Sequence, residues 1–240
     1  MPVYVVTGAR GGIGLEYVRQ LTADPSNTVI TTVRDTSANI SDLQAVMAKS
    51  EGRGYIVQCD VSSEASIATL AQSIPPILSG DEKIDVLVNN AGIQQSEGQT
   101  GLNLDGASLL AHMTTNVVGP AKVTQTLLPY LREGSAIIAN ISSGLGSLAL
   151  LSDGTIEPDM TPYSISKCAL NMLMVHQAHQ LKGKAIVVCV DPGHVKTAMG
   201  GPEAPVEAKD SARSVLKVLS GLKAEDSGKF FHPDGANAPF

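Results

Sequence analysis

A tyrosine and a lysine stand four residues apart in the segment Thr161–Lys167, which reads TPYSISK. Thr161 followed by Pro162 is typical of a helix start, with Thr161 as the N-cap and Pro162 at the first helical position. The spacing then places Tyr163 and Lys167 on one face of that helix. Because a nearby cation and the positive end of a helix dipole both favour the phenolate, the pair predicts a tyrosine that exchanges a proton near neutral pH. The same spacing also fits an ordinary helix surface, so other parts of a site are needed.

A glycine-rich turn lies between the first predicted strand and the first predicted helix. It reads TGARGGIG over residues 7–14, and its glycines are spaced differently from the commoner GxGxxG pattern. Glycines allow a tight turn and close approach of the backbone to a ligand, and the helix that follows directs free N–H groups at a phosphate. A turn without a ligand is the alternative. The residues predicted to bind a cofactor here are Gly8, Arg10, Gly12, Ile13 and Gly14.

The end of the second predicted strand bears on the choice between NAD and NADP. Folds that bind NAD usually place an acid about 20 residues beyond the glycines, whereas an arginine accommodates the 2′-phosphate of NADP. Val33 occupies the place of the acid and Arg34 follows it, while Arg10 of the glycine turn is a second cation within reach. We therefore expect NADP(H) to be preferred over NAD(H). Asp35 keeps NAD open, and Arg34 could also be a solvated surface residue.

Short β-branched runs alternate with longer helical patterns along the whole chain. The runs are continuously apolar, as in a parallel sheet that is covered on both faces. We predict an α/β protein of the Rossmann type, a doubly wound parallel sheet flanked by helices on both faces, forming a single domain over residues 1–240. The predicted strands are 3–7, 28–33, 54–58, 84–88, 136–141 and 185–190, with a short one at 229–232. The predicted helices are 13–23, 40–49, 64–74, 104–131, 162–181 and 207–222.

Bulk composition excludes several classes of protein. The net charge is −6 with no block of Lys or Arg, which argues against a nucleic-acid partner or an anionic membrane surface. No apolar run is long enough to span a membrane, and a strand predicted at residue 3 leaves no room for a signal peptide. Three scattered cysteines favour a reducing compartment, so we expect a cytoplasmic protein. No His, Cys or acidic spacing indicates a metal site, and His176, His179 and His194 are interpreted as non-catalytic.

Taken together, the motifs resemble the short-chain dehydrogenase/reductase family from end to end. The motifs are TGARGGIG, Asp60-Val61, Asn89-Asn90-Ala91-Gly92, Asn116, Ser142-Ser143, Tyr163-xxx-Lys167 and Asp191-Pro192-Gly193, in the family's order. The tail, with residues 199–202 and 228–231, is similar to carbonyl-reductase-type members. The resemblance implies that Tyr163 is the general acid or base, that Lys167 binds the nicotinamide ribose and lowers the pKa of Tyr163, and that Ser143 donates a hydrogen bond to the substrate oxygen. Ser143 is chosen over Ser142 because the family uses the second serine of such a pair.

Asn116 is supported by an argument from the residues themselves. Pro120 has no N–H to donate to the carbonyl four residues back, which is that of Asn116. The carbonyl is then left free at a kink, where it could hold a water for proton relay, as the resemblance implies. A kink of significance only for packing is the alternative.

Further cofactor contacts are implied by the resemblance at the ends of later strands. Asp60 is placed at the adenine, and a turn or cap role for this residue is the alternative. The other implied residues are Val61, Asn90, Ala91, Gly92, Pro192, Gly193, Val195 and Thr197, in addition to Tyr163 and Lys167.

We therefore expect an NADP(H)-preferring oxidoreductase that transfers a hydride between nicotinamide and a carbonyl or secondary alcohol substrate. A catalytically weak cofactor-binding or sensing protein on the same fold is the alternative, and epimerisation or dehydration is disfavoured because only residues 191–240 remain for a second substrate domain. Residues 145–161 and 198–206 are expected to form the substrate pocket. A homodimer, a homotetramer and a monomer are all compatible with the sequence.

Overall fold

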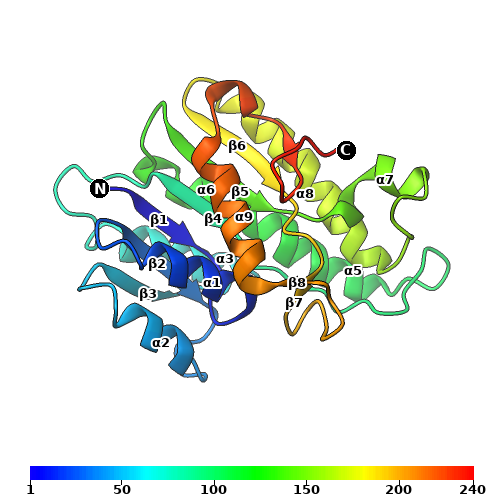
Figure 1. The fold of residues 1–240 in the computed structure, drawn as a ribbon, viewed down its shortest axis with the longest axis horizontal. Helices are drawn as coiled ribbons and strands as arrows, with labels where there is room; N and C mark the ends of the chain where they lie inside the picture. Colours follow the sequence, from blue (N-terminus) through cyan, green and yellow to red (C-terminus); the bar gives the residue numbers. More distant parts are fainter.

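Seven strands form one parallel sheet at the centre of the molecule (Figure 1). The computed structural model describes residues 1–240. The strand order is β3-β2-β1-β4-β5-β6-β9, so the chain reverses direction across the sheet between β1 and β4. The strands are β1 (Val3–Val6), β2 (Thr28–Val33), β3 (Gly54–Gln58), β4 (Val86–Asn89), β5 (Ala136–Ile141), β6 (Ala185–Val190) and β9 (Phe230–Phe231). The predicted Rossmann-type sheet is confirmed, with strand ends that differ from the predicted ones by two residues at most.

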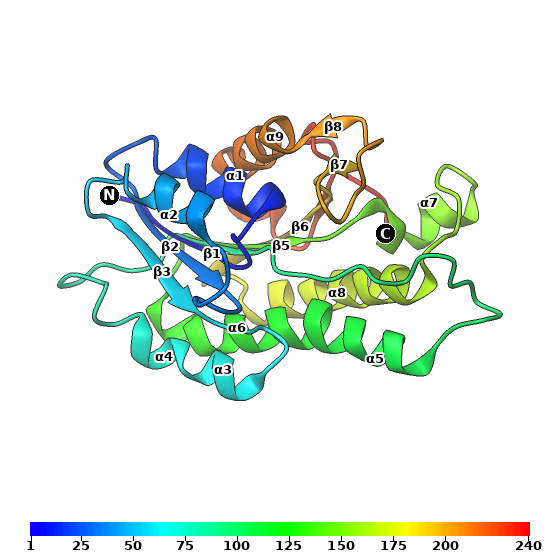
Figure 2. The same ribbon diagram turned by 90° about the horizontal axis from the view of Figure 1, so that it is seen from below.

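Helices cover both faces of this sheet, as Figure 2 shows from its edge. On one face lie α1 (Gly12–Leu21), α2 (Ser41–Met47) and α9 (Ala208–Gly221). On the other face lie α3 (Glu64–Ala68), α4 (Leu70–Ser73), α5 (Gly106–Met113), α6 (Gly119–Leu127) and α8 (Thr161–Gln180). Each face has its own apolar core of more than 20 buried residues, because alternate side chains of every strand point to opposite faces.

The longest predicted helix, residues 104–131, is interrupted in the structure. Between α5 and α6 the chain forms a π-helical turn at Thr114–Val118, in which the Gly119 N–H donates to the Thr114 carbonyl five residues back. The segment ends in a 3-10 turn at Leu128–Tyr130. Pro120 lies just beyond the π turn, where its missing N–H removes the α-helical bond to Asn116. The predicted kink is therefore a π turn that contains Asn116.

Two irregular segments lie beyond the carboxyl ends of β5 and β6. The first contains a 3-10 turn at Gly144–Gly146 and the short helix α7 (Leu148–Ser152). The second is held by the parallel pair β7 (Val195–Lys196) and β8 (Val206–Glu207). The carbonyl of Phe240 accepts the Ala149 N–H at 3.0 Å, so the last residues of the chain support α7. None of the helices combines the length and the apolar character needed to cross a membrane.

Candidate active site

A cavity of about 510 Å³ lies where the carboxyl ends of β1, β2, β3, β4 and β5 meet. In an open parallel sheet this edge, at the point where the strand order reverses, is where ligands bind. Fifteen of the predicted site residues line the cavity: Gly8, Arg10, Gly12, Ile13, Gly14, Arg34, Asp60, Val61, Asn90, Ala91, Gly92, Tyr163, Lys167, Pro192 and Thr197. Asn116, Ser143, Gly193 and Val195 lie outside this lining.

The glycine turn packs directly against the end of β4. Gly8 has a φ of 72°, in the left-handed region, and a Cβ there would lie 2.7 Å from the Ala91 Cα. A Cβ on Gly14 would lie 2.5 Å from the Gly8 carbonyl oxygen and 2.6 Å from the Asn90 amide nitrogen. Only glycine fits these two positions without displacing backbone. The two glycines therefore fix the turn against its neighbours, and all four glycines of the turn line the cavity.

The amino end of α1 is free to bind an anion. Gly11 is its N-cap, no side chain caps the helix, and no acidic residue stands in its first turn. A Cβ on Gly11 would meet no atom within 4 Å, so the space in front of the helix is open. Unpaired N–H groups at the positive end of a helix are well suited to a phosphate. These residues fit the phosphates of a dinucleotide.

Asn90 ties the glycine turn to β4 through its side chain. Its Nδ2 donates to the carbonyl of Thr7 at 2.8 Å and to that of Gly8 at 3.1 Å. In return the Thr7 hydroxyl accepts the backbone N–H groups of Asn90 and Ala91, both at 3.0 Å. The amide and the hydroxyl thus fix the distance between the first and fourth strands at the floor of the cavity.

At the end of β2, the neighbouring charges of Arg34 and Asp35 have different environments. Val33 is buried, whereas Arg34 and Asp35 are exposed and line the cavity. The Asp35 carboxylate accepts the Ser37 N–H at 2.8 Å and the Ser37 hydroxyl at 2.7 Å. These hydrogen bonds lower the pKa of Asp35, with a smaller contribution from the charge of Arg34. The carboxylate is occupied by its own loop, while the guanidinium of Arg34 has no acidic partner within 4 Å.

Asp60 has a similar local role at the end of β3. Its carboxylate accepts the Ser62 N–H at 2.9 Å and the Ser62 hydroxyl at 2.7 Å, which closes a turn before α3. The residue still lines the cavity beside Val61. Asp60 therefore combines the turn role with a position at the wall of the site.

The helix that carries Tyr163 begins differently from the prediction. Thr161 is the first helical residue, and Met160 precedes it in the left-handed region with a φ of 53° and no side-chain cap. The expected N-cap role of Thr161 is therefore wrong by one position. The loop turns into the helix at Met160, whose N–H is held by the Asp159 carboxylate at 2.7 Å. The backbone N–H of Thr161 donates outside the helix, to the Gln99 carbonyl at 3.0 Å.

Lys167 lies one turn after Tyr163 and points into the protein. Its Nζ donates to the Ile141 carbonyl at 2.7 Å and lies 5.5 Å from the centroid of the Tyr163 ring. Only 5% of the residue is exposed. Burial lowers the pKa of Lys167 to about 8. The side chain is thus a cation that is held at the end of β5 with limited solvation.

Tyr163 shares this crowded edge, and its pKa moves opposite to the expectation. Burial raises the pKa of the phenol; the side-chain hydrogen bond with Ser143 acts to lower it, and the charge of Asp191 acts to raise it. In the protein alone, the loss of solvation is the largest contribution to the pKa of Tyr163, so the predicted lowering is wrong here. The phenol holds its proton across the neutral range.

The two serines after β5 point in different directions. The Ser142 hydroxyl donates to the Asn171 side chain at 2.6 Å and is buried. The Ser143 oxygen accepts the Leu145 N–H at 3.2 Å, and its hydroxyl is close enough to the Tyr163 phenol to act on the pKa of that group. Ser143 is therefore beside the phenol, and Ser142 braces α8 against β5.

Asn116, in the π turn, makes side-chain hydrogen bonds to two other segments near the site. Its Oδ1 accepts the Ile93 N–H at 2.8 Å, and its Nδ2 donates to the Ile93 carbonyl and to the Ser166 hydroxyl, both at 2.9 Å. Ser166 in turn donates to the Tyr163 carbonyl at 2.7 Å. The side chain of Asn116 therefore joins the backbone after β4 to the helix of Tyr163.

The segment after β6 closes the site from the other side. Asp191 accepts the Gly193 N–H at 2.9 Å, and burial raises the pKa of its carboxyl. Gly193 has a φ of 81°, and this turn leads to Val195, which is 4% exposed. Thr197 reaches the glycine turn, since a Cβ on Gly12 would lie 3.3 Å from its methyl group.

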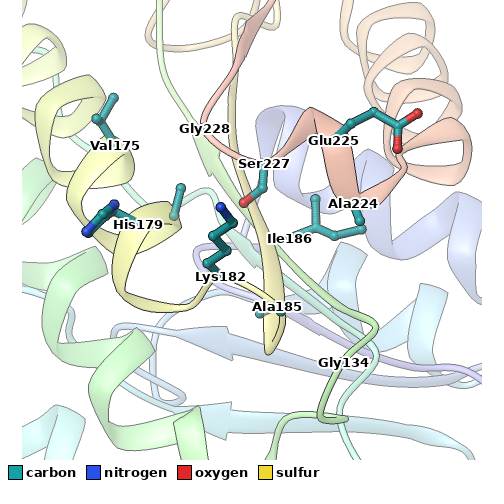
Figure 3. Close-up of a pocket in the computed structure, with 12 residues that line it drawn as sticks. Gly134, Val175, His179, Lys182, Ala185, Ile186, Ala224, Glu225, Ser227 and Gly228 are labelled. Carbon is teal, nitrogen blue, oxygen red and sulfur yellow. The ribbon is translucent and has the colours of Figure 1, made fainter.

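A second cavity, of about 400 Å³, lies at the opposite end of the sheet around the start of β6 (Figure 3). It is lined by the end of α8, by Gly134 and by residues 224–228, and includes His179, Lys182 and Glu225. These three charged or titratable residues are exposed at its rim, and none of the predicted site residues lines it. The functional site is therefore the larger cavity.

The structure adds residues that the sequence motifs did not indicate. Ile93 and Thr115 line the cavity beside the tyrosine helix. Ala198 and Met199, from the predicted pocket segment 198–206, also line it, whereas no residue of the other predicted segment, 145–161, does. Ile93 directly follows the Asn-Asn-Ala-Gly motif, and Thr115 precedes Asn116. Ile93 and Thr115 could therefore have been predicted only from their positions next to a motif.

Comparison with known proteins agrees with this geometry. Residues 2–207 match the family model of the short chain dehydrogenases. The protein C-signal of Myxococcus xanthus is 40% identical over 65% of this chain and 93% of its own length. The NADPH-bound carbonyl reductase from chicken fatty liver superposes with a TM-score of 0.90 at 33% identity, over 100% of both chains. The carbonyl reductase Sniffer of D. melanogaster gives a TM-score of 0.90 at 28% identity, also over 100% of both chains.

With motifs, topology and site geometry in agreement, the chain belongs to the short-chain dehydrogenase/reductase family, and it is similar to the carbonyl reductases within it.

Proposed function

We propose that this protein is an NADP(H)-preferring oxidoreductase that reduces a carbonyl compound or oxidises the corresponding secondary alcohol. The observation that carries the proposal is the convergence of Tyr163, Lys167 and Ser143 at the end of β5, beside a cavity that begins at the glycine turn. Bound in that cavity, the cofactor would supply or accept the hydride.

The acid–base step falls to Tyr163. The Tyr163 phenol is protonated at neutral pH, so it has a proton to donate during carbonyl reduction. Ser143, beside that phenol, is placed to donate to the same substrate oxygen as negative charge develops. Lys167 supplies a fixed positive charge next to the ring and would bind the ribose of the cofactor. Asn116 would hold a water for proton relay at its carbonyl, to which Pro120 cannot donate.

The preference for NADP(H) rests on the charges at the end of β2. The Asp35 carboxylate is engaged by Ser37 and is a poor acceptor for ribose hydroxyls. Arg34 and Arg10 are exposed at the rim of the cavity, where a 2′-phosphate would be matched by charge-assisted hydrogen bonds. The similar carbonyl reductase from chicken binds NADPH, which supports the same assignment.

Apolar side chains lie close to Ser143. A Cβ on Gly144, the residue after Ser143, would lie 2.6 Å from the Ile156 Cδ1, 3.2 Å from a carboxylate oxygen of Asp191 and 3.8 Å from the Leu150 Cδ1. Met199 is 47% exposed and lines the cavity from the opposite segment. We therefore propose an apolar or aromatic ketone, aldehyde or quinone as substrate. The single sheet supports a single-domain enzyme, and the three free cysteines suit a cytoplasmic location.

The test is a panel of ketones, aldehydes and quinones assayed with NADPH and NADH in parallel, with direct titration of both cofactors. We expect turnover of apolar carbonyl compounds and a lower KM for NADPH than for NADH. Tight NADPH binding with no turnover across the panel would instead identify a binding or sensing protein. Equal use of NADH would refute the cofactor assignment.

A further inference from the structure

His112, on α5, is a buried histidine with both ring nitrogens engaged. It is 1% exposed; its Nδ1 lies 2.7 Å from the Ser108 carbonyl oxygen, and its Nε2 lies 3.2 Å from the Gln95 backbone nitrogen. A backbone N–H can only donate and a carbonyl can only accept, so Nε2 must be the acceptor and Nδ1 must carry the proton. The two backbone partners therefore specify one neutral tautomer.

His112 and Asn116 act on the same short segment. Asn116 pairs with both backbone groups of Ile93, and His112 accepts the N–H of Gln95. Four residues of helix rise about 6 Å, and two residues of extended chain span about 6.6 Å. The distance between His112 and Asn116 along the helix thus matches the distance between Gln95 and Ile93 along the extended segment. The segment Ile93–Gln95 is fixed at two points one helical turn apart.

Both fixing residues also reach the helix of Tyr163. The ring of His112 meets the Tyr163 ring edge to face, with centroids 6.4 Å apart and an interplanar angle of 77°. Asn116 bonds to Ser166, which donates to the Tyr163 carbonyl. His112 therefore contacts the ring of Tyr163, whereas Asn116 contacts its backbone through Ser166. Ile93, at the other end of these contacts, lines the cofactor cavity.

We propose that His112 is a positioning residue, which sets the Tyr163 phenol at a fixed distance from the cavity wall at Ile93–Gln95. The inference rests on the proposed function, in which Tyr163 transfers the proton. Its physical basis is that catalysis depends on alignment: a displacement of about 1 Å can reduce turnover about a hundredfold. The Nε2 acceptor is the essential feature, because it joins α5, which packs against the helix of Tyr163, to the wall.

Three variants separate the acceptor from the ring. His112→Gln keeps an acceptor at the Nε2 position without an aromatic ring. His112→Phe keeps a ring against Tyr163 without an acceptor, and His112→Leu removes both. His176→Phe, at an exposed position of α8, is the matched control for replacing a helical histidine.

We expect the Phe and Leu variants to lose about 10- to 100-fold in kcat, with the Kd for NADPH within about twofold of the wild type. The Gln variant should stay within about threefold of the wild-type kcat. Deuterated NADPH should give a larger isotope effect on kcat in the Phe variant, because the chemical step becomes more limiting. A Gln variant as impaired as the Phe variant, or a Phe variant with wild-type kcat, would overturn the proposal.

Hydrogen exchange of the Gln95 amide gives a readout that needs no turnover. This amide should exchange slowly in the wild type and the Gln variant, and faster in the Phe and Leu variants. Equal protection in all four proteins would refute the hydrogen bond as the positioning contact. Should the wild type bind NADPH but turn over no carbonyl compound, the proposed function fails, whereas loss of Gln95 protection in the Phe variant would still establish the contact.

Discussion

Lys167 donates from its Nζ to the carbonyl oxygen of Ile141 at 2.7 Å, which joins the tyrosine helix to the carboxyl end of β5. No carboxylate lies within 4 Å of this ammonium. The charge is thus buried on a backbone dipole rather than paired with an acid, and the lowered pKa of Lys167 reflects that burial. In the protein without cofactor, the ammonium is a cost to stability that the site retains for its chemistry.

The cost of burying this charge predicts that the difference in unfolding free energy between the wild type and Lys167→Met depends on pH. A pKa lowered from 10.5 to about 8 corresponds to on the order of 3 kcal/mol. Below pH 8 Lys167 is protonated in both the folded and the unfolded state, so the full penalty is present. Between pH 8 and 10.5 the unfolded state binds more protons than the folded state, so stability rises with pH. Urea unfolding without cofactor at pH 7 and pH 10 should show the wild type gaining stability relative to the variant. A constant difference would contradict the burial cost.

Tyr163→Phe tests the proton donor. The variant removes one oxygen from a half-buried ring, so NADPH affinity should stay within about twofold while kcat falls by about 10²–10⁴-fold, the usual loss for a general acid. Stopped-flow reduction and fluorescence titration of NADPH measure the two quantities separately. Retention of a tenth or more of the wild-type kcat would exclude Tyr163 as the acid.

The paired serines offer an internal control. Ser143→Ala should lower kcat by about 10²–10³-fold, the loss typical of one donor to a developing oxyanion. Ser142→Ala removes the hydroxyl that donates to Asn171, so it should cost about 1–2 kcal/mol of stability with a smaller effect on kcat. The measurements are steady-state kinetics and thermal unfolding of both variants. A reversed pattern would assign the substrate hydrogen bond to Ser142.

Arg34→Ala tests the cofactor preference. Loss of a charge-assisted hydrogen bond to a phosphate is worth about 1.5–3 kcal/mol, so KM for NADPH should rise by about 10- to 100-fold. KM for NADH should change by less than about threefold, because NADH lacks the 2′-phosphate that Arg34 would bind. Asp35→Ala is the neighbouring control, because its carboxylate is already engaged by Ser37. An equal rise for both cofactors would show that Arg34 does not recognise the phosphate.

Local patterns in the sequence were sufficient for the sheet and for most of the cofactor cavity. Strands such as Ala136–Ile141 are marked by continuous β-branched runs, and the glycine turn follows from its place between a strand and a helix. The left-handed Met160 was not predictable, because its conformation depends on the path of the loop and on the Gln99 contact at its neighbour. His112 was missed because its partners, at Gln95 and Tyr163, are distant in sequence and are brought together only by the fold.

The direction of the pKa shift of Tyr163 could not be predicted from the motif. Spacing alone shows that Lys167 is near and that the helix dipole is favourable, and both lower a phenol pKa. The extent of burial depends on how β5, the π turn and α8 enclose the ring, and it decides the sign.

The π turn at Thr114–Val118 has a consequence for how the chain tolerates changes in length. A π turn contains one residue more than an α turn, because its hydrogen bond spans five residues in place of four. Removing one residue from the turn would therefore give an α-helical turn and leave α5 and α6 facing nearly the same way. The helices would keep their packing, whereas Asn116 would lose its place opposite Ile93 and Ser166. The extra residue of the turn thus serves the position of one side chain and not the packing of the two helices.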